Sequence, residues 1–326
     1  MEKTILIASA SVDYQTYEPV ISLLEQRGYS TVTYKTDKVF AGEDFFSMSV
    51  DDEGELKASY NGKSISPDAV CAAWYRKVSN FAIPNAADNV AKQLSVSNEV
   101  RCLHNTIWPL YPENKWLNAP DNMINADRKM KQLMVAKQVG FAIPHTVISS
   151  DWQEIERSLA PAGETIAVKM IKGVIADNNH LQAMYTSVLD VPTREKLKLY
   201  TVPFPGLYQP FIKKAREWRV TVVGDEVFPA AIYTSDEAKD DWRKLQETSA
   251  VVFKNEALPD DISEQCIAYL GKMGLKYGAF DLIEQPDGAT IFLECNPNGQ
   301  YGWLEDALGF SISHAIVSEI LKIAQQ

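Results

Sequence analysis

The chain has 326 residues, a formal net charge of −11 and no low-complexity tract, so it can bury a large core divided over two or three domains. The acidic balance without a long basic patch argues against a nucleic-acid partner, and no apolar run approaches the length of a membrane span. The four cysteines are widely spaced, which excludes a zinc or redox motif and predicts thiols buried in a reducing compartment.

The first 115 residues predict a small α/β domain. Residues 4–8 are too short for a signal segment and predict a first β-strand, so we expect a cytoplasmic protein. A helical pattern that ends near Gly28 and a strand at 29–34 complete a βαβ start. Further strands are expected at 45–50, 56–60 and 69–75, and a helix at 86–107. The aromatic, proline-rich stretch 107–120 predicts a linker or a packed crossover, and the first domain is set at 1-115.

Residues 116–206 predict a second domain that begins with an amphipathic helix at 125–140. In that helix Met130, Leu133 and Met134 stand at helical spacing and are expected to face inward, and Gly140 ends it. The elements expected next are an edge strand at 141–146, a helix at 151–159, a buried strand at 166–170, a hairpin within 173–187 and a short helix at 192–197.

Residues 207–326 predict a third domain built on a new sheet that starts at Tyr208. The strands expected for that sheet are 209–212, 217–223 and 227–233. A helix at 260–274, closed by Gly274, and a final apolar helix at 311–323 flank a predicted hairpin.

That hairpin carries the most informative side chains of the sequence. Two apolar strands meet at a turn that ends in Asp-Gly, and folding about Asp287 sets Asp281 nearly opposite Glu294. Glu294 and Asn296 are two residues apart and therefore share one face of their strand. Three hard oxygen ligands on one surface suit magnesium. The alternative is an ordinary β-hairpin whose polar residues face the solvent.

Two lysines are candidate phosphate ligands. Lys169 lies inside an apolar strand, where an unpaired lysine is costly to bury unless its amine extends to water at an edge. Lys129 lies near the start of the 125–140 helix, and an exposed helix lysine is the alternative interpretation.

Two arginines could stabilise a phosphoryl group in transfer. Alternation puts Glu217 and Arg219 on the same face of strand 217–223, so they could instead form a surface ion pair. Arg243 offers a second such charge, with a loop ion pair to Asp240 or Asp241 as its alternative.

Several catalytic motifs are absent from the sequence. There is no P-loop, no Gly-x-Gly-x-x-Gly, no Gly-x-Ser-x-Gly and no His-Glu-x-x-His, and the four histidines are scattered. Two lysines, two arginines and a carboxylate metal site suit phosphoryl transfer by positioning and electrostatics.

In their order along the chain, these residues resemble the ATP-grasp superfamily. The chain looks more narrowly like the ATP-grasp ligases that cyclise graspetides, the microviridin-type ribosomal peptides. The segments that carry this resemblance are 73–76, 217–224, 241–244 and 281–303. The resemblance implies an α/β (α+β) ATP-grasp fold: an N-terminal pre-ATP-grasp domain (1-115), a central subdomain (116-206) and a C-terminal subdomain with the magnesium site (207-326).

The resemblance also implies ATP and Mg2+ as cofactors. ATP would lie between the central and C-terminal subdomains, with its adenine against the backbone of residues 209–212 and the Ile212 N–H as a donor. The cofactor-binding residues so implied are Lys129, Lys169, Gln209, Phe211, Ile212 and Glu217. Asp281, Glu294 and Asn296 would hold magnesium, and Arg219 and Arg243 would be catalytic.

The implied partner is a ribosomal precursor peptide with a leader and a core, and the resemblance also implies a homodimer. Its Asp or Glu carboxylates would be joined to Ser/Thr hydroxyls or a Lys amine through an acyl phosphate. In the helix that starts at Thr193, Glu195 would contact the leader, but Lys196 replaces the second acid of the family pattern. A RimK-like ligase that adds amino acids and a non-catalytic peptide-binding protein are the alternatives.

Overall fold

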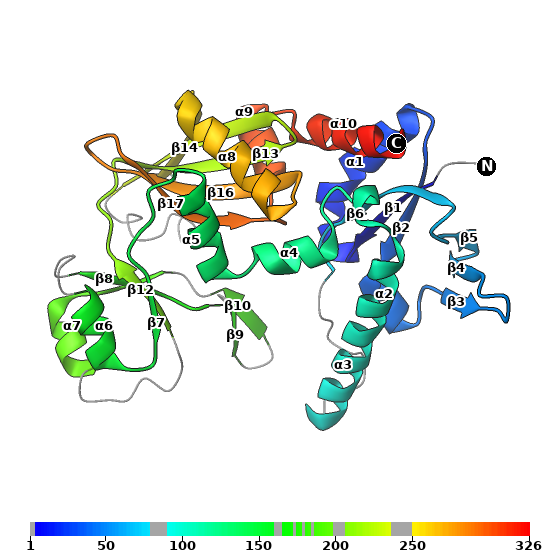
Figure 1. Cartoon of the computed structure of the whole chain (residues 1–326), viewed down its shortest axis with the longest axis horizontal. Coiled ribbons are helices and arrows are strands. Elements are labelled where there is room, and N and C mark those ends of the chain that lie inside the picture. Colours follow the sequence, from blue (N-terminus) through cyan, green and yellow to red (C-terminus); the bar gives the residue numbers. More distant parts are fainter. Residues whose placement is uncertain are drawn as a thin grey trace.

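A computed structural model describes residues 4–78, 90–159, 165–171, 174–177, 180–183, 186–197, 206–235 and 250–326. Three regions follow one another along the chain (Figure 1). The N-terminal sheet lies at one end, a large sheet lies beside it, and a smaller central sheet lies below the large one. No helix in these ranges combines the length and apolar character needed to cross a bilayer.

The N-terminal region is a three-stranded parallel sheet, as the βαβ pattern predicts. In this sheet β1 (Thr4–Ser9) lies between β2 (Ser30–Lys35) and β6 (Val70–Tyr75). The crossover helix α1 (Tyr14–Gln26) ends just before Gly28, whose φ is +82°. The remaining elements are η1 (Ser11–Asp13), α2 (Thr36–Ala41), β3 (Phe46–Val50), β4 (Leu56–Tyr60), β5 (Lys63–Ser64) and α3 (Val90–Ile107).

The aromatic stretch after α3 is a packed crossover. It contains the short helices η2 (Trp108–Leu110) and η3 (Glu113–Lys115), and the side chains of Trp108, Tyr111 and Trp116 are buried in the N-terminal core. Trp108 and Trp116 meet edge to face, with ring centroids 6.0 Å apart. The chain therefore leaves this core only at α4 (Pro120–Ala126).

The predicted helix at 125–140 is wrong in its extent and in its buried face. Residues 127–128 interrupt the helix and separate α4 from α5 (Lys129–Gln138). Leu133 is buried as expected, but Met130 and Met134 are 44% and 63% exposed. Gln132 faces inward instead, because its amide donates to the Ala126 and Cys295 carbonyls at 2.6 and 2.9 Å. The hydrogen bonds of Gln132 thus add a polar residue to a buried face that otherwise consists of Leu133, Val135 and Ala136.

The central region is a four-stranded antiparallel sheet of order β11-β8-β12-β7. Its strands are β7 (Val147–Ser149), β8 (Ile166–Lys169), β11 (Ser187–Leu189) and β12 (Gly206–Pro210). The helices α6 (Trp152–Leu159) and α7 (Val191–Leu197) and the hairpin of β9 (Val174–Asp177) with β10 (His180–Ala183) agree with the sequence.

Two strand predictions in this region are wrong. The expected edge strand at 141–146 begins only at residue 147, and before it Ala142 alone forms a bridge, to Ile291. The strand expected to open a new sheet at Tyr208 is β12, which pairs with β8 and β7 because Tyr208 packs in the central core beside Trp152. The domain bounds themselves stay a prediction.

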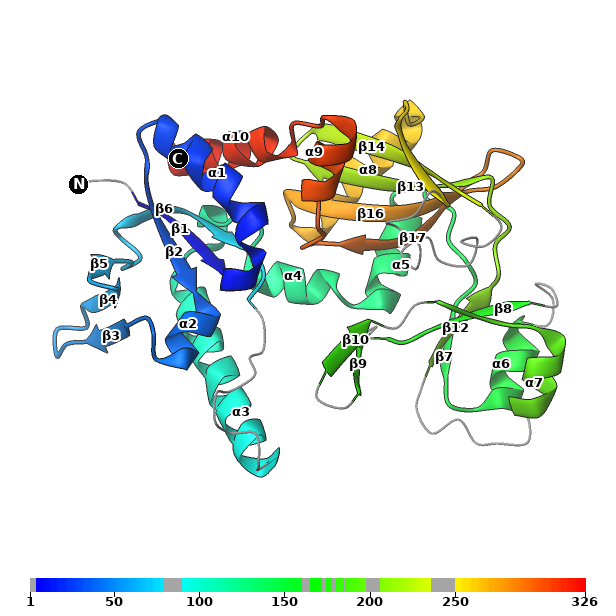
Figure 2. The ribbon, with the colours of Figure 1, turned by 180° about the vertical axis from the view of Figure 1, so that it is seen from behind.

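The C-terminal region is a five-stranded antiparallel sheet of order β15-β14-β13-β16-β17. Its strands are β13 (Arg216–Val223), β14 (Glu226–Thr234), β15 (Val251–Asn255), β16 (Tyr277–Glu284) and β17 (Thr290–Asn296). One face packs against α5 and α8 (Asp260–Met273), which Gly274 closes in the left-handed conformation. Beyond the sheet, α9 (Gly302–Leu308) leads to α10 (Ile312–Ala324), which lies beside α1 of the N-terminal region (Figure 2).

Asn118 joins the crossover to this sheet. Its side chain is 2% exposed and donates to the Tyr277 and Pro297 carbonyls at 2.8 and 3.1 Å. Its oxygen accepts from the Lys276 and Tyr277 N–H groups. The start of β16 and the residue after β17 therefore share one buried amide.

We predict that Asn118→Ala lowers the free energy of unfolding by about 3 kcal/mol, because it leaves several buried backbone groups unpaired. Asn122→Ala is the matched control, since that amide caps α8 at a more exposed position and its loss should cost about 1 kcal/mol. Urea unfolding of both variants measures the difference, and equal losses would refute a special role for Asn118.

Candidate active site

The two carboxylates predicted to face each other do so. Asp281 of β16 pairs with Glu294 of β17, and a bulge follows at once, so that Leu282 pairs with Phe292. The turn between the strands closes with a Gly288 N–H to Gln285 carbonyl bond of 2.9 Å. Asn296 lies two residues beyond Glu294 and is exposed.

Two cations flank this carboxylate pair. Arg219 lies directly opposite Asp281 on β13, and its Nη1 donates to Asp281 Oδ1 at 2.8 Å. On the other side the amine of Lys129, the first residue of α5, bonds to Glu294 Oε2. The surface pair of Glu217 with Arg219, which the sequence left open, does not form; Glu217 bonds to Lys214 instead.

Both cations stay charged despite their burial. Burial lowers the pKa of Lys129, but the charge of Glu294 and the hydrogen bond to it outweigh that effect and raise the pKa. Burial likewise opposes the charge of Arg219, and Asp281 again reverses the shift, so that its pKa is also raised. The site therefore holds a row of alternating charge: Arg219, Asp281, Glu294 and Lys129.

Arg219 has a hydrogen-bonding position to spare. Arg219 is 8% exposed, and its Nη2 donates to the Gln300 carbonyl at 3.3 Å. Its Nε has no hydrogen-bond partner among the described residues. A Cβ at Gly299 would lie 2.4 Å from the Ala279 Cβ and 2.6 Å from Arg219 Nη2, so only glycine allows the loop to approach β16 and Arg219 this closely. A buried guanidinium with an unpaired N–H fits an anionic ligand.

The donor set fits magnesium. Two carboxylates and one amide supply hard oxygens, and within the described ranges no cluster of three or more His, Cys, Asp or Glu side chains offers a rival metal site. Magnesium commonly takes a few protein oxygens and completes its shell with waters and phosphates. The assignment of Asp281, Glu294 and Asn296 as ligands stays a prediction.

Two family models match this chain in tandem. Residues 4–123 match the MvdD pre-ATP grasp domain, and residues 126–320 match the RimK-like ATP-grasp domain. The chain belongs to the RimK-like ATP-grasp family. It is an ADP-forming ATP-grasp ligase with a pre-ATP-grasp domain, and the fold inferred from the sequence is confirmed.

Solved structures align over nearly the whole ligase. One is a RiPP-associated ATP-grasp ligase from Chryseobacterium gregarium, in complex with ADP and a leader and core peptide. Its sequence is 25% identical, and the alignment covers 98% of this chain and 97% of that one with a TM-score of 0.85. Macrocyclase MdnC from Microcystis aeruginosa MRC, bound with precursor peptide MdnA, is 26% identical, with a TM-score of 0.82 over 98% and 99%.

A third structure is that of ATP-grasp ligase PsnB complexed with a phosphomimetic variant of minimal precursor, Mg and ADP. It is 19% identical, with a TM-score of 0.77 over 99% of both chains, and therefore shows the shared fold alone. The first structure thus contains ADP and the third contains magnesium and ADP, where the sequence of this chain predicted ATP and magnesium as cofactors. No curated protein matches this chain.

The hinge expected to meet adenine follows β12. The Gln209 amide donates to Thr146 Oγ1 at 2.9 Å, and the Phe211 N–H donates to the Thr165 carbonyl at 3.0 Å. Phe211 can therefore offer adenine its carbonyl but not its N–H. Within the described ranges no backbone hydrogen bond engages the Ile212 N–H, and its role as a donor to adenine stays a prediction.

The remaining predicted residues do not join the charged row. Lys169 ends β8 opposite Leu207 and is half-buried, and among the described residues no hydrogen bond or ion pair connects it to that row. Glu195 is exposed on α7 of the central region. Arg243 lies in 236–249, outside the described residues, so its role stays a prediction.

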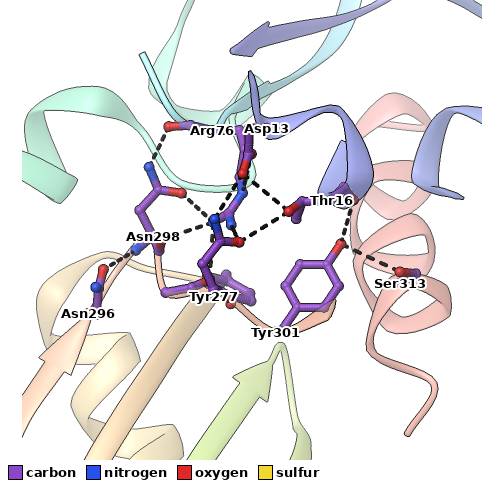
Figure 3. Close-up of polar contacts among 10 residues, drawn as sticks. Asp13, Thr16, Arg76, Tyr277, Asn296, Asn298, Tyr301 and Ser313 are labelled. Carbon is purple, nitrogen blue, oxygen red and sulfur yellow. Dashed lines mark hydrogen bonds and ion pairs between the residues drawn. The ribbon is translucent and has the colours of Figure 1, made fainter. Parts of the chain in front are cut away.

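Sequence reasoning missed a buried group that lies beside the ligase site. Arg76 follows β6, is 1% exposed and pairs with Asp13 at 3.0 Å (Figure 3). Its other donors reach Asn298 and Gln300, in the loop after β17. Segment 73–76 is among those that carry the family resemblance, but no role for Arg76 followed from it, because a charged residue directly after a buried strand does not identify partners more than 200 residues away.

We predict that Glu294→Gln raises the dissociation constant of magnesium-ADP about tenfold or more, because the amide lacks the charge that the metal binds. The matched control is Glu284→Gln, which removes a carboxylate of the same hairpin that pairs with Arg216 instead. Calorimetry at saturating magnesium measures both affinities. An unchanged affinity in Glu294→Gln would remove Glu294 from the metal shell.

Proposed function

We propose that this ligase macrocyclises a ribosomal precursor peptide. The observation that carries the proposal is the alignment over nearly its full length with two proteins that are at least 25% identical. One was solved in complex with a leader and core peptide and the other with a precursor peptide. The alignment includes the N-terminal region, which a bare nucleotide site would not require. The proposed bond joins a peptide Asp or Glu carboxylate to a Ser or Thr hydroxyl, giving an ester, or to a Lys amine, giving an amide.

Bound magnesium-ATP would supply the activating phosphoryl group, so that the peptide carboxylate becomes an acyl phosphate, ADP leaves, and the hydroxyl or amine then displaces phosphate. The chain's own task is to align anions and neutralise their charge. Asp281, Glu294 and Asn296 would hold the metal. Arg219 would direct its spare N–H at the transferring oxygens, since its guanidinium is already fixed by Asp281.

Other residues would complete the nucleotide and peptide sites. Lys129 is held next to the carboxylate pair and can meet a phosphate oxygen with its remaining N–H bonds. We assign Arg243 to the phosphoryl group and Glu195 to the leader. The residues assigned to the nucleotide are Lys169, Glu217 and the hinge residues Gln209, Phe211 and Ile212. The homodimer and the cytoplasmic location stay predictions.

A second candidate function is the addition of free amino acids to a peptide or a small acid. The RimK-like model, which covers residues 126–320, favours it, because the same nucleotide site would serve both reactions. The two functions differ in the acceptor, so ADP release with free amino acids alone would favour this one.

We expect incubation of the ligase with ATP, magnesium and its cognate precursor to reduce the peptide mass by one water for each ring formed. Mass spectrometry before and after base hydrolysis separates the two bond types, because an ester regains that water and an amide does not. An unchanged precursor mass with folded, ADP-binding enzyme would contradict the macrocyclase proposal.

Arg219→Ala should lower kcat about 100-fold with a much smaller loss of ATP affinity, because the positive charge is needed most where charge develops in the transition state. Arg216→Ala is the matched control: it also loses an arginine–carboxylate pair between β13 and β16, but away from the charged row. Steady-state ADP release per folded molecule measures the effect. Equal losses of kcat and affinity would indicate simple ground-state binding.

A further inference from the structure

A buried polar cluster joins the N-terminal region to the loop that follows β17 (Figure 3). We name it the Arg76 clamp and define it as Asp13 and Arg76 from the N-terminal region with Asn298, Gly299 and Gln300 from the loop. Asp13 and Arg76 form an ion pair whose side chains are 2% and 1% exposed. Such a pair persists in the interior only when its remaining hydrogen-bonding positions are also satisfied.

The guanidinium of Arg76 binds backbone carbonyls of the loop. Nη1 donates to the Asn298 and Gly299 carbonyls at 2.9 and 3.1 Å, and also to Asn298 Oδ1 at 2.6 Å. Nη2 donates to Gln300 Oε1 at 2.6 Å, and Nε is held by Asp13. Two of the three guanidinium nitrogens therefore bind one short loop, and the third fixes the guanidinium to Asp13.

The loop is held from two further directions. The Gln300 amide donates to Asp13 Oδ1 at 3.0 Å, and the Tyr277 hydroxyl donates to the Gly299 carbonyl at 2.7 Å. The Asn298 amide donates back to the Arg76 carbonyl. The clamp is thus a closed network rather than a single contact between two domains.

Both ends of the clamped loop contact the predicted catalytic groups. At one end the Asn298 N–H donates to Asn296 Oδ1 at 2.8 Å, which orients the side chain of a predicted metal ligand. At the other end the Gln300 carbonyl accepts from Arg219 Nη2 at 3.3 Å. A shift of this loop would therefore displace an amide ligand and an arginine together.

We propose that Arg76 is a positioning residue of the ligase site: through the backbone of residues 298–300, the pre-ATP-grasp domain sets the orientation of Asn296 and Arg219. The inference rests on the roles assigned to those two residues in the proposed function. It gives the N-terminal domain a part in nucleotide chemistry without contact to the nucleotide, because groups that orient metal ligands tune affinity from outside the shell.

The test compares magnesium-ADP binding in two clamp variants and one control, and a third variant, Arg76→Ala, serves for chemical rescue. Arg76→Lys keeps the charge and loses the fork. Asn298→Ala keeps the Asp13–Arg76 ion pair and the backbone N–H to Asn296, so it removes no proposed ligand while it loses both side-chain bonds to Arg76. Ser313→Ala alters the same domain interface through Tyr301 and Glu305, away from the loop backbone that Arg76 binds.

We expect both clamp variants to raise the calorimetric dissociation constant of magnesium-ADP about tenfold, while Ser313→Ala leaves it within about twofold. ADP binding measured without magnesium should change much less than binding with it. In Arg76→Ala, added guanidinium at non-denaturing concentration should restore part of the magnesium-dependent affinity, which a general loss of folding would not allow.

Clamp variants that melt earlier but bind magnesium-ADP as the wild type does would overturn the inference and reduce the clamp to a domain contact. If Arg76→Ala does not fold, Arg76→Lys and Asn298→Ala decide the question. A wild type that binds magnesium-ADP without cyclising any precursor would refute the proposed function and leave this result standing.

Discussion

Two carboxylates that face each other on adjacent strands are the constraint on which the site depends. Like charges directly opposite in a sheet destabilise it, and partial burial strengthens their repulsion. The fold places one cation on each side, Arg219 beside Asp281 and Lys129 beside Glu294. Because a carboxylate can accept several bonds, the cations compensate the charge of the pair without excluding a metal from it.

The strand that carries Glu294 and Asn296 is an edge strand, so its outer backbone groups need partners from outside the sheet. The side chain of Gln132 pairs with both the N–H and the carbonyl of Cys295, and the Phe292 N–H donates to the Ala142 carbonyl. Helix α5 therefore fixes the edge strand as well as supplying Lys129. A site on an edge strand stays open on one side for a ligand, yet keeps the rigidity that preorganised catalysis requires.

Local signals in the sequence were enough for most elements and for the central geometry of the site. The Asp-Gly turn and two-residue alternation predicted that Asp281 would face Glu294, because strand register follows directly from the turn. Partners that depend on distant contacts could not be predicted in this way. Arg219 pairs with Asp281 rather than Glu217, and β12 joins the central sheet, because alternation shows that a strand is buried but not which strand lies beside it. The Arg76 clamp joins residues 222 positions apart, and no local pattern indicates such a contact.

The alternation of β17 also separates hard ligands from a soft one. Cys295 stands between Glu294 and Asn296 in sequence, but its side chain turns to the core side, where it is 1% exposed and packs in the cluster that contains Phe280. Burial raises the pKa of this thiol well above its ordinary value, so it remains protonated at neutral pH. Because the thiolate and not the thiol binds metals, Cys295 cannot compete for a cation at the carboxylate face. The same pleat that aligns two oxygen ligands therefore excludes sulfur and favours a hard ion such as magnesium.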